Sequence, residues 1–356
     1  MMTQIIDGTW VPDLLNLEPG TTLGDAIYVG NLEDGSEAWH AQRGKVIGGS
    51  DVASICDIPG RFQSPYILWL EKAGYKERDE VSPEMEELFE WGHLLEEPII
   101  KRFTDMTGLA VARTGTWVNK DRSWHGINPD GLVIDHDGQP VGIMECKYSM
   151  MGFGYENEML PAKYVAQVRY YAAGFGFQFG YLGAFFNGKL HLFMIPADMN
   201  QPVKNLRTGA EEYYYDDAST ILPKVQEFVN MLATNTPPPL TGSGDELDWK
   251  LKRHPEIDGK DIVIPYDLAI RWADAREGLD AAEAQHKLVK AELLEAMGTA
   301  KNAKAGYDIS KSKKAKTVAS RRPIKGGAIS IVAVGKAHRP EPYELKLEEE
   351  AAPAAA

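Results

Sequence analysis

Apolar and polar residues recur with helical spacing in several parts of the first half of the chain. The segment SPYILWLEKAG has apolar residues three and four apart and ends at a glycine, which predicts a short helix over residues 64–73. A second short helix is predicted over 50–56. The clearest helical stretch covers 84–107, with Ser82 as its N-cap and Gly108 at its end. Pro98 lies inside this stretch and predicts a kink or a division into two helices.

The pattern then changes to short strands and further helices. In chain order it predicts strands over about 109–118, 130–136 and 141–147, a helix that begins at Pro161, two strands that flank Asn187-Gly188, and a helix over 211–234. Gln139 and Pro140 mark the turn between the second and third of these strands.

A long amphipathic helix is predicted over 265–297. Its apolar face consists of residues spaced three or four apart: Leu268, Trp272, Ala275, Leu279, Ala282, His286, Val289, Leu293 and Met297. Taken alone, the pattern favours a packing or oligomerisation helix. The Pro- and Gly-rich segment TPPPLTGSGDE, residues 236–246, separates this helix from the preceding elements and reads as a domain boundary.

Composition adds the general class of protein. The chain has 356 residues, of which 44% are hydrophobic and 25% charged, as is typical of a globular protein. No apolar run approaches the roughly 18 to 20 residues that a membrane span requires, and the first ten residues do not resemble a signal peptide. Cys56 and Cys146 are too few for a disulfide framework or a four-cysteine metal site. We therefore expect a cytoplasmic protein, in the host cytoplasm if a phage encodes it, without a membrane partner.

Charge is distributed unevenly along the chain. The net charge is −14, which does not by itself indicate a DNA-binding protein. Residues 1–42 contain seven acidic residues and no Lys or Arg, whereas residues 301–325 contain nine Lys or Arg and one acidic residue. The basic segment KSKKAKTVASRRPIK could hold DNA phosphates or could be a solubilising tail.

The segment INPDGLVIDHDGQPVGIMECKYS carries candidate chemistry. Residues two apart on a strand share a face, so Glu145 and Lys147 project together, and Met144 and Cys146 point to the opposite side. If the two strands pair as a hairpin, Asp130 lies beside them. Two convergent carboxylates suit a hard cation such as Mg²⁺, and an adjacent ammonium can stabilise charge on a phosphate.

An alternative remains open on these residues alone, because an acid and a lysine two apart on a strand are common in surface ion pairs. Two neighbouring features favour a site. The strand has one apolar face, although its other face carries the carboxylate and the amine. In the segment AQVRYY, Gln167 and Tyr171 lie four apart on one helix face, from which they could reach the same point.

At these residues the chain resembles the PD-(D/E)xK nuclease superfamily, and more closely the YqaJ viral recombinase family, which includes the lambda-type exonuclease. The resemblance covers about residues 37–235. It includes five segments in the family's order: WHAQRGKVIGGSDVASI, WGHLLEEPIIKRF, NPDGL, ECK and YVAQVRYY. It implies an α/β (α+β) fold with a restriction-endonuclease-like core, a mixed twisted sheet flanked by helices, and here a C-terminal helical extension.

The resemblance also implies roles for individual residues. Asp130, Glu145, the backbone carbonyl of Cys146 and a helix glutamate would hold Mg²⁺, for which Mn²⁺ could substitute. The helix glutamate matches Glu96, with Glu97 adjacent as an alternative. Lys147 would orient or activate the attacking water, and Gln167 would lie near the scissile phosphate. The positions that bind a terminal 5′-phosphate match Arg43 and Ser50, with Tyr171 as a further DNA contact.

The implied function is a Mg²⁺-dependent exonuclease that digests linear double-stranded DNA from its 5′ ends, in the 5′ to 3′ direction. The single strands that remain would serve phage-type recombination. The implied partners are a single-strand annealing protein and further copies of the chain in a trimeric ring. The domain organisation expected is an acidic extension (1–36), the nuclease domain (37–235), a linker (236–246), a helical and basic region (247–340) and a disordered tail (341–356).

Two other functions remain as alternatives. One is a RecB-like nuclease of another specificity, but the chain has neither four cysteines for an iron–sulfur cluster nor a phosphate-binding GxxxxGK[ST] loop. The other is a non-catalytic DNA-end-binding scaffold, which the complete set of Asp130, Glu145 and Lys147 disfavours.

Overall fold

The computed structural model describes residues 2–6, 9–12, 14–33, 35–77, 79, 81–150, 159–253, 255–305, 316–323 and 329–333. The chain forms two compact units, Met1–Glu256 and Ile257–Ala356, and each is described separately. No helix among these residues has the length and apolar character needed to cross a membrane.

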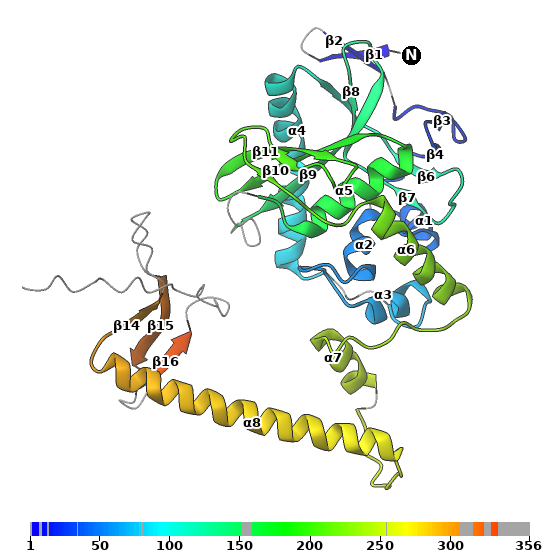
Figure 1. The fold of residues 1–356 in the computed structure, drawn as a ribbon. Helices are drawn as coiled ribbons and strands as arrows, with labels where there is room; N and C mark the ends of the chain where they lie inside the picture. Colours follow the sequence, from blue (N-terminus) through cyan, green and yellow to red (C-terminus); the bar gives the residue numbers. More distant parts are fainter. Residues whose placement is uncertain are drawn as a thin grey trace, which may run out of the picture. The chain divides into compact units, whose positions relative to one another are not determined.

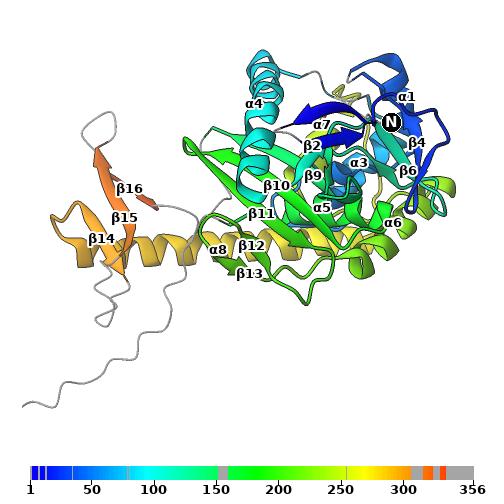
Figure 2. The same cartoon turned by 90° about the horizontal axis from the view of Figure 1, so that it is seen from above.

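The first unit is built on a seven-stranded mixed sheet (Figures 1 and 2). In spatial order its strands are β13 (Glu211–Glu212), β12 (Val203–Asn205), β11 (Lys189–Pro196), β10 (Phe179–Phe186), β9 (Pro140–Ser149), β8 (Gly131–Ile134) and β5 (Ala110–Ala112). Only the central pair β9 and β10 is parallel, and the other neighbours are antiparallel. A parallel pair requires a crossover connection, and helix α5 (Ala162–Phe175) lies in the connection between these two strands.

Helices cover the two faces of this sheet, and the alternation along β9 divides its side chains between them. Ile143 belongs to the larger hydrophobic cluster, which includes Val165 and Val168 of α5. Met144 and Cys146 belong to a second cluster with Ile99 and Phe103 of α4 (Pro83–Thr107). The predicted division of β9 into two faces is therefore confirmed, and one face packs on α4 while the other packs on α5.

Three short helices precede α4: α1 (Glu37–Lys45), α2 (Gly49–Ile55) and α3 (Pro65–Lys72). The predicted short helices over 50–56 and 64–73 are confirmed. Helix α2 packs directly on α5, and Gly49 permits this close approach. A Cβ atom at Gly49 would lie 2.7 Å from the Tyr171 ring and 2.8 Å from Gln167 Cγ.

Residues 1–36 contain more regular structure than predicted. They were expected only as an acidic extension, but the chain forms two hairpins, β1 (Met2–Ile6) with β2 (Thr9–Pro12), and β3 (Thr22–Leu23) with β4 (Ala26–Gly30). Strand β4 then joins β6 (Thr116–Asn119) and β7 (Gly126–Ile127) in a four-stranded sheet. The physical reason is burial, because Ala26 and Tyr28 alternate inward on β4 and Tyr28 packs edge-on against the buried Trp117.

Two other predictions of elements were partly wrong. The single strand expected over 109–118 is broken into β5 and β6, which belong to different sheets. The helix expected over 211–234 begins only at Ala218, as α6 (Ala218–Ala233). Asp217 caps that helix by accepting a hydrogen bond from the Ser219 N–H at 2.9 Å, and the preceding Glu211–Glu212 pairs as a strand instead.

The predicted helix around Pro98 is one continuous element, so its division into two helices was wrong. Ser82 accepts a hydrogen bond from the Met85 N–H, and Gly108 ends the helix in the left-handed conformation with φ of 73°. The Asn187-Gly188 turn between β10 and β11 is also confirmed, with φ of 51° and 69°.

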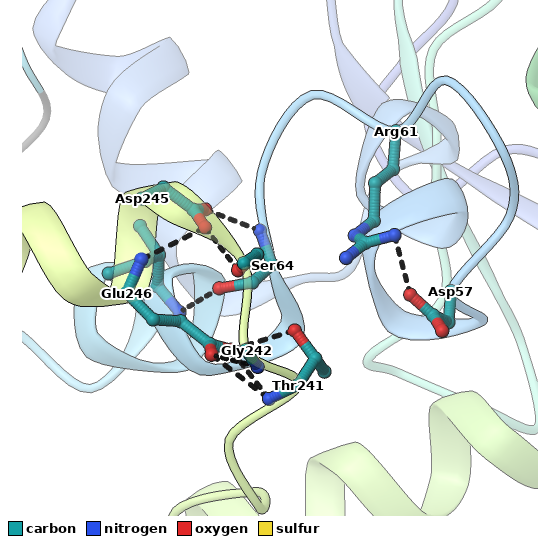
Figure 3. A network of polar contacts seen from close by, with 9 residues as sticks. Asp57, Arg61, Ser64, Thr241, Gly242, Asp245 and Glu246 are labelled. Atoms are coloured by element: carbon teal, nitrogen blue, oxygen red, sulfur yellow. Dashed lines mark hydrogen bonds and ion pairs between the residues drawn. The ribbon is translucent and has the colours of Figure 1, made fainter. Parts of the chain in front are cut away.

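Helix α7 (Gly244–Arg253) begins inside the segment 236–246 that was predicted as a boundary, and it belongs to the first unit (Figure 3). The Asp245 carboxylate accepts a hydrogen bond from the Ser64 N–H at 2.7 Å, just before α3. The Glu246 carboxylate accepts bonds from the backbone N–H groups of Thr241 and Gly242 at 2.9 Å each. The Asp245 bond fixes the start of α7 against α3, and the Glu246 bonds hold the residues that precede α7.

The second unit contains the predicted long helix, α8 (Tyr266–Met297), followed by three antiparallel strands. They are β14 (Asn302–Ala305), β15 (Lys316–Pro323) and β16 (Ile329–Ala333). Much of the basic segment 311–325 and all of the predicted tail 341–356 lie outside the described residues.

Candidate active site

The β8–β9 hairpin brings Asp130 to the middle of β9, as predicted. Gly131 pairs with Met144 across the two strands, which places Asp130 opposite Glu145. The Cys146 N–H donates a hydrogen bond of 2.6 Å to Asp130 Oδ2. This bond fixes one carboxylate oxygen of Asp130 beside the strand that carries Glu145 and Lys147.

Glu145 is the centre of the arrangement. Its side chain is almost fully buried, with 3% of the residue exposed. Its Oε1 atom accepts hydrogen bonds from Lys147 Nζ at 2.5 Å and from Gln167 Nε2 at 2.6 Å. Its Oε2 atom is buried and has no hydrogen-bond partner within the described residues. An unpaired buried carboxylate oxygen is costly, so it indicates a position where a ligand is needed.

The pKa values of the two central groups reflect this crowding. Burial, followed by repulsion from the Asp130 carboxylate, raises the pKa of Glu145 to about 8, with a further contribution from Glu96. Burial alone would lower the pKa of the Lys147 ammonium, but Glu145 and Asp130 outweigh it and raise that pKa above its usual value. Lys147 is therefore a positively charged group at neutral pH.

Glu96 lies on α4 near these carboxylates, but its present contact is with another residue. Arg113 Nη1 lies 3.5 Å from Glu96 Oε2. The Glu96 charge nevertheless contributes to the raised pKa of Glu145. No group of three or more His, Cys, Asp or Glu side chains in the described part of the chain is arranged to hold a metal ion. The structure thus joins Asp130, Glu145, Lys147 and Gln167 directly, with Glu96 at their border. The adjacent Glu97 is exposed.

Arg43 and Ser50, which the family resemblance assigns to one phosphate site, form a second polar group. Arg43 Nη2 donates a hydrogen bond of 3.1 Å to Ser50 Oγ, from the end of α1 to the first turn of α2. The guanidinium also lies 4.6 Å from the centre of the Trp39 ring. Both residues line a pocket of about 50 Å³.

Tyr171 links the two polar groups. It lines the pocket of Arg43, and it lies on α5 one turn after Gln167, which contacts Glu145. Burial first and then the Glu145 carboxylate raise the pKa of the Tyr171 hydroxyl, while Arg43 opposes them. The pocket and the carboxylate cluster are therefore adjacent parts of one site.

The structure adds residues that sequence reasoning did not identify. Asn128 and Thr116 line the same pocket, and the Thr116 hydroxyl donates a hydrogen bond of 3.1 Å to Asn128 Oδ1. Asn128 directly precedes Pro129-Asp130, so its position in the motif could have suggested a role. Arg113 gave no such signal, because its contact with Glu96 depends on the packing of α4 against β5.

A buried ion pair between Lys72 and Asp51 holds the backbone of the residues that line the pocket. Lys72 Nζ lies 2.8 Å from Asp51 Oδ2 and also donates to the carbonyl oxygens of Arg43 at 2.9 Å and Val46 at 2.8 Å. Asp51 in turn accepts a bond of 3.0 Å from the Gly48 N–H. Burial would raise the pKa of Asp51, but the Lys72 and Arg43 charges outweigh it and lower that pKa. The pair connects the end of α1, the start of α2 and the end of α3.

The donor set fits a hard divalent cation. Carboxylate oxygens are the ligands that Mg²⁺ and Mn²⁺ accept in proteins. Glu145 offers a buried oxygen without a partner, and the carboxylates of Asp130 and Glu96 raise its pKa. A cation at this point would offset that repulsion. The same arrangement places an ammonium group and an amide beside the cation position, where a phosphate could be held.

Comparison with solved structures gives weak likenesses. Two structures of an alkaline exonuclease (LHK-Exo) from Laribacter hongkongensis, one in complex with dAMP, each cover 61% of this chain and 99% of their own, with 18% and 19% identity and a TM-score of 0.41. The structure of SSO0001 covers 52% of this chain and 76% of its own, with 13% identity and a TM-score of 0.28. No curated protein matches the chain.

The family assignment rests on the sequence of the first unit. Residues 38–178 match the family model described as the YqaJ-like viral recombinase domain. This segment contains the Arg43 pocket, Glu96, the β8–β9 hairpin and the part of α5 that carries Gln167 and Tyr171. It ends before residue 235, to which the resemblance was extended. The resemblance inferred from the motifs is therefore confirmed over residues 38–178, which match the YqaJ-like viral recombinase domain.

Proposed function

We propose that this chain is a divalent-metal-dependent deoxyribonuclease. It hydrolyses phosphodiester bonds of linear double-stranded DNA from 5′ to 3′ and generates single strands for phage-type recombination. The match to a viral recombinase domain supports a nuclease of this class. The proposal depends above all on one observation, the buried Oε2 atom of Glu145, which has no partner in the described residues and lies beside Lys147, Gln167 and Asp130.

Glu145, Asp130, Glu96 and the backbone carbonyl of Cys146 would hold Mg²⁺, with Mn²⁺ as a substitute. When bound, the metal supplies Lewis-acid stabilisation of the phosphoryl oxygens and a more acidic water. The chain's own residues position these ligands. The Cys146 N–H fixes Asp130, and Lys147 and Gln167 both fix Oε1 of Glu145, which leaves Oε2 to face the cation.

Lys147 acts through its charge. Lys147 Nζ lies 2.5 Å from Glu145 Oε1, and the Glu145 and Asp130 carboxylates raise the pKa of its ammonium. In this proposal the ammonium orients the attacking water and stabilises the negative charge that develops on the phosphate. The side-chain amide of Gln167 has two N–H donors, and one of them bonds to Glu145. The second suits it to hold a phosphate oxygen at the same point.

The pocket of Arg43 and Ser50 binds the terminal 5′-phosphate in this proposal. A guanidinium and a hydroxyl in the first turn of a helix are donors that suit a phosphate dianion. Tyr171 lines this pocket on the side of Gln167 and contacts the DNA between the two groups. The binding of a 5′-terminal phosphate next to the cleavage point gives the reaction its 5′ to 3′ direction.

The expected partners follow from the same family. They are linear double-stranded DNA as substrate, a single-strand annealing protein that binds the product strand, and further copies of the chain, with a trimeric ring as the family resemblance implies.

Digestion of a linear duplex tests the proposed activity. The wild-type chain is expected to release nucleotides with Mg²⁺ or Mn²⁺ and to stop when EDTA is added. Glu145→Gln keeps the shape of the side chain but removes its charge, so the rate should fall on the order of 10²- to 10³-fold. Glu97→Gln, which removes an exposed carboxylate beside Glu96, serves as the matched control and should retain activity.

Two outcomes would oppose this proposal. Wild-type digestion that persists in excess EDTA would exclude a required metal. A duplex that binds the wild-type chain but remains intact with both metals would favour the DNA-end-binding scaffold instead.

A further inference from the structure

Helix α8 carries an apolar face that the described part of its own unit leaves exposed. We propose that this face pairs with α8 of a second copy of the chain in an antiparallel coiled coil. The inference concerns the second unit, and it does not depend on the nuclease activity proposed for the first.

The spacing of the apolar face has the seven-residue repeat of a coiled coil. Eight successive positions alternate between steps of four and three: Leu268, Trp272, Ala275, Leu279, Ala282, His286, Val289 and Leu293. These residues occupy alternate d and a positions of three and a half heptads. An apolar repeat that alternates steps of four and three residues is typical of two helices that wind around each other. Ile270, Leu288 and Leu294 lie outside this repeat.

The seam is exposed along most of its length. Leu268 is 42% exposed, Trp272 69%, Leu279 48% and Val289 47%. Met297, at the end that approaches β14, is the one residue of α8 that the described structure buries. Five of the eight seam positions carry a large apolar side chain, and a partner that covers them gains the free energy of their burial.

In an antiparallel arrangement of two copies, the side chains of the seam meet in layers. In the two central layers, Leu279 of each copy packs beside Ala282 of the other. Each a position then packs beside a d position of the second copy. The layers pair Trp272 with Val289, Leu279 with Ala282, His286 with Ala275, and Leu293 with Leu268 of the second copy. A parallel arrangement would instead place His286 beside His286 and Trp272 beside Trp272 in the centre of the seam.

The charges beside the seam also favour the antiparallel direction. In that direction the flanking e positions face each other, which brings Arg276 of each copy to Glu283 of the second copy. The flanking g positions likewise bring Arg271 to Glu292, and no like charges meet. In a parallel pair, Arg271 would face Arg276 of the second copy, which is repulsive. The sequence of α8 is therefore self-complementary in one direction only.

The arginines are available for these contacts. Arg276 lies 3.5 Å from Asp280 and Arg271 lies 3.6 Å from Asp267, both within α8 and both between exposed side chains. Such surface pairs contribute little and can be exchanged for a contact across an interface.

The mass of the full chain in solution tests the interface. Leu279→Lys places a charge in the centre of the seam, and Leu288→Lys makes the same change on the outer face of α8, where the leucine is 53% exposed. Light scattering coupled to size exclusion should give the Leu279→Lys variant half the mass of the wild type and of the Leu288→Lys variant. Circular dichroism should be equal for the two variants, since lysine is a good helix former.

Exchange of charges tests the direction. Arg276→Glu should weaken the association at least tenfold, because it faces Glu283 of the second copy. The double variant Arg276→Glu/Glu283→Arg should restore it. The proposal is overturned if the wild type and Leu279→Lys variant have the same mass, which includes a monomer in which the seam packs on its own chain. It is also overturned if Arg276→Glu strengthens the association, as a parallel pair would require.

Discussion

At the scale of single residues, the centre of the site followed from the periodicity of one strand. Glu145 and Lys147 share a face because they are two apart, and the turn over residues 135–139 brings Asp130 to them. The contact of Arg113 with Glu96 could not be predicted, because it joins elements whose packing the sequence does not specify. The same holds for the three simultaneous contacts of Lys72, which connect residues 21 to 29 positions apart.

A prediction at this scale concerns His125, which lies apart from the carboxylates. It is fully buried, stacks on Tyr170 at 3.8 Å, and its Nε2 lies 3.0 Å from the Tyr170 carbonyl oxygen. Burial lowers its pKa from 6.5 to about 3. Below pH 6.5 the unfolded chain therefore binds a proton that the folded chain does not. Stability from this residue is complete above that pH and is lost as pH falls toward 3, by up to about 1.4 kcal/mol per pH unit.

Urea unfolding at pH 7.5, 6 and 5 measures this effect. His125→Gln keeps a hydrogen-bond donor but cannot titrate, so its free energy of unfolding should fall less steeply with pH than that of the wild type. Equal slopes for the two proteins would contradict the assignment, whatever the difference in their absolute stability.

At the scale of secondary-structure elements, local signals fixed most helix ends and failed where tertiary pairing competed. Helix α4 begins after Ser82 and ends at Gly108, as the capping preferences of these residues indicate, and Pro98 does not divide it. Residues 211–217 were predicted as helix but include a strand, because pairing with β12 outweighs the helical pattern. Strand β4 was missed because its partner β6 lies about 90 residues later, and a single segment gives no sign of such a pairing.

The position of α1 relative to α2 leads to a second prediction. The Lys72–Asp51 pair holds the carbonyl of Arg43, so removal of both charges should disturb the pocket without leaving a buried charge unpaired. In the Lys72→Met/Asp51→Asn variant, the preference for 5′-phosphorylated over 5′-hydroxyl ends should fall about tenfold, a loss of about 1.4 kcal/mol. Activity on hydroxyl ends should change less.

Lys76→Met is the matched control for this variant. Lys76 is also a largely buried lysine near the end of α3, and its Nζ lies 3.2 Å from Glu71 and 3.1 Å from Asp79, away from the pocket. It should keep the preference for 5′-phosphate. An equal loss of preference in both variants would mean that Lys72 contributes only to general stability.

At the scale of the whole molecule, the chain separates into a unit that carries the proposed chemistry and a unit that carries a helix with a self-complementary face. The existence and length of α8 were predictable, since a helical pattern of 32 residues leaves little ambiguity. The pairing of residues 22–30 with a sheet of the first unit was not predictable from the sequence. The division of the chain into an extension, a nuclease domain, a linker and a basic region remains a prediction.

The most direct test of the proposed function is digestion of a linear duplex that carries a 5′-phosphate on one strand only, with a different label on each strand. With Mg²⁺, the wild-type chain should degrade the phosphorylated strand from its 5′ end and spare the other strand. Arg43→Gln should reduce this difference between the strands, because the pocket loses the guanidinium charge that would hold the 5′-phosphate. Degradation of both strands at equal rates, or degradation from 3′ ends, would contradict the proposed direction and the role of the pocket.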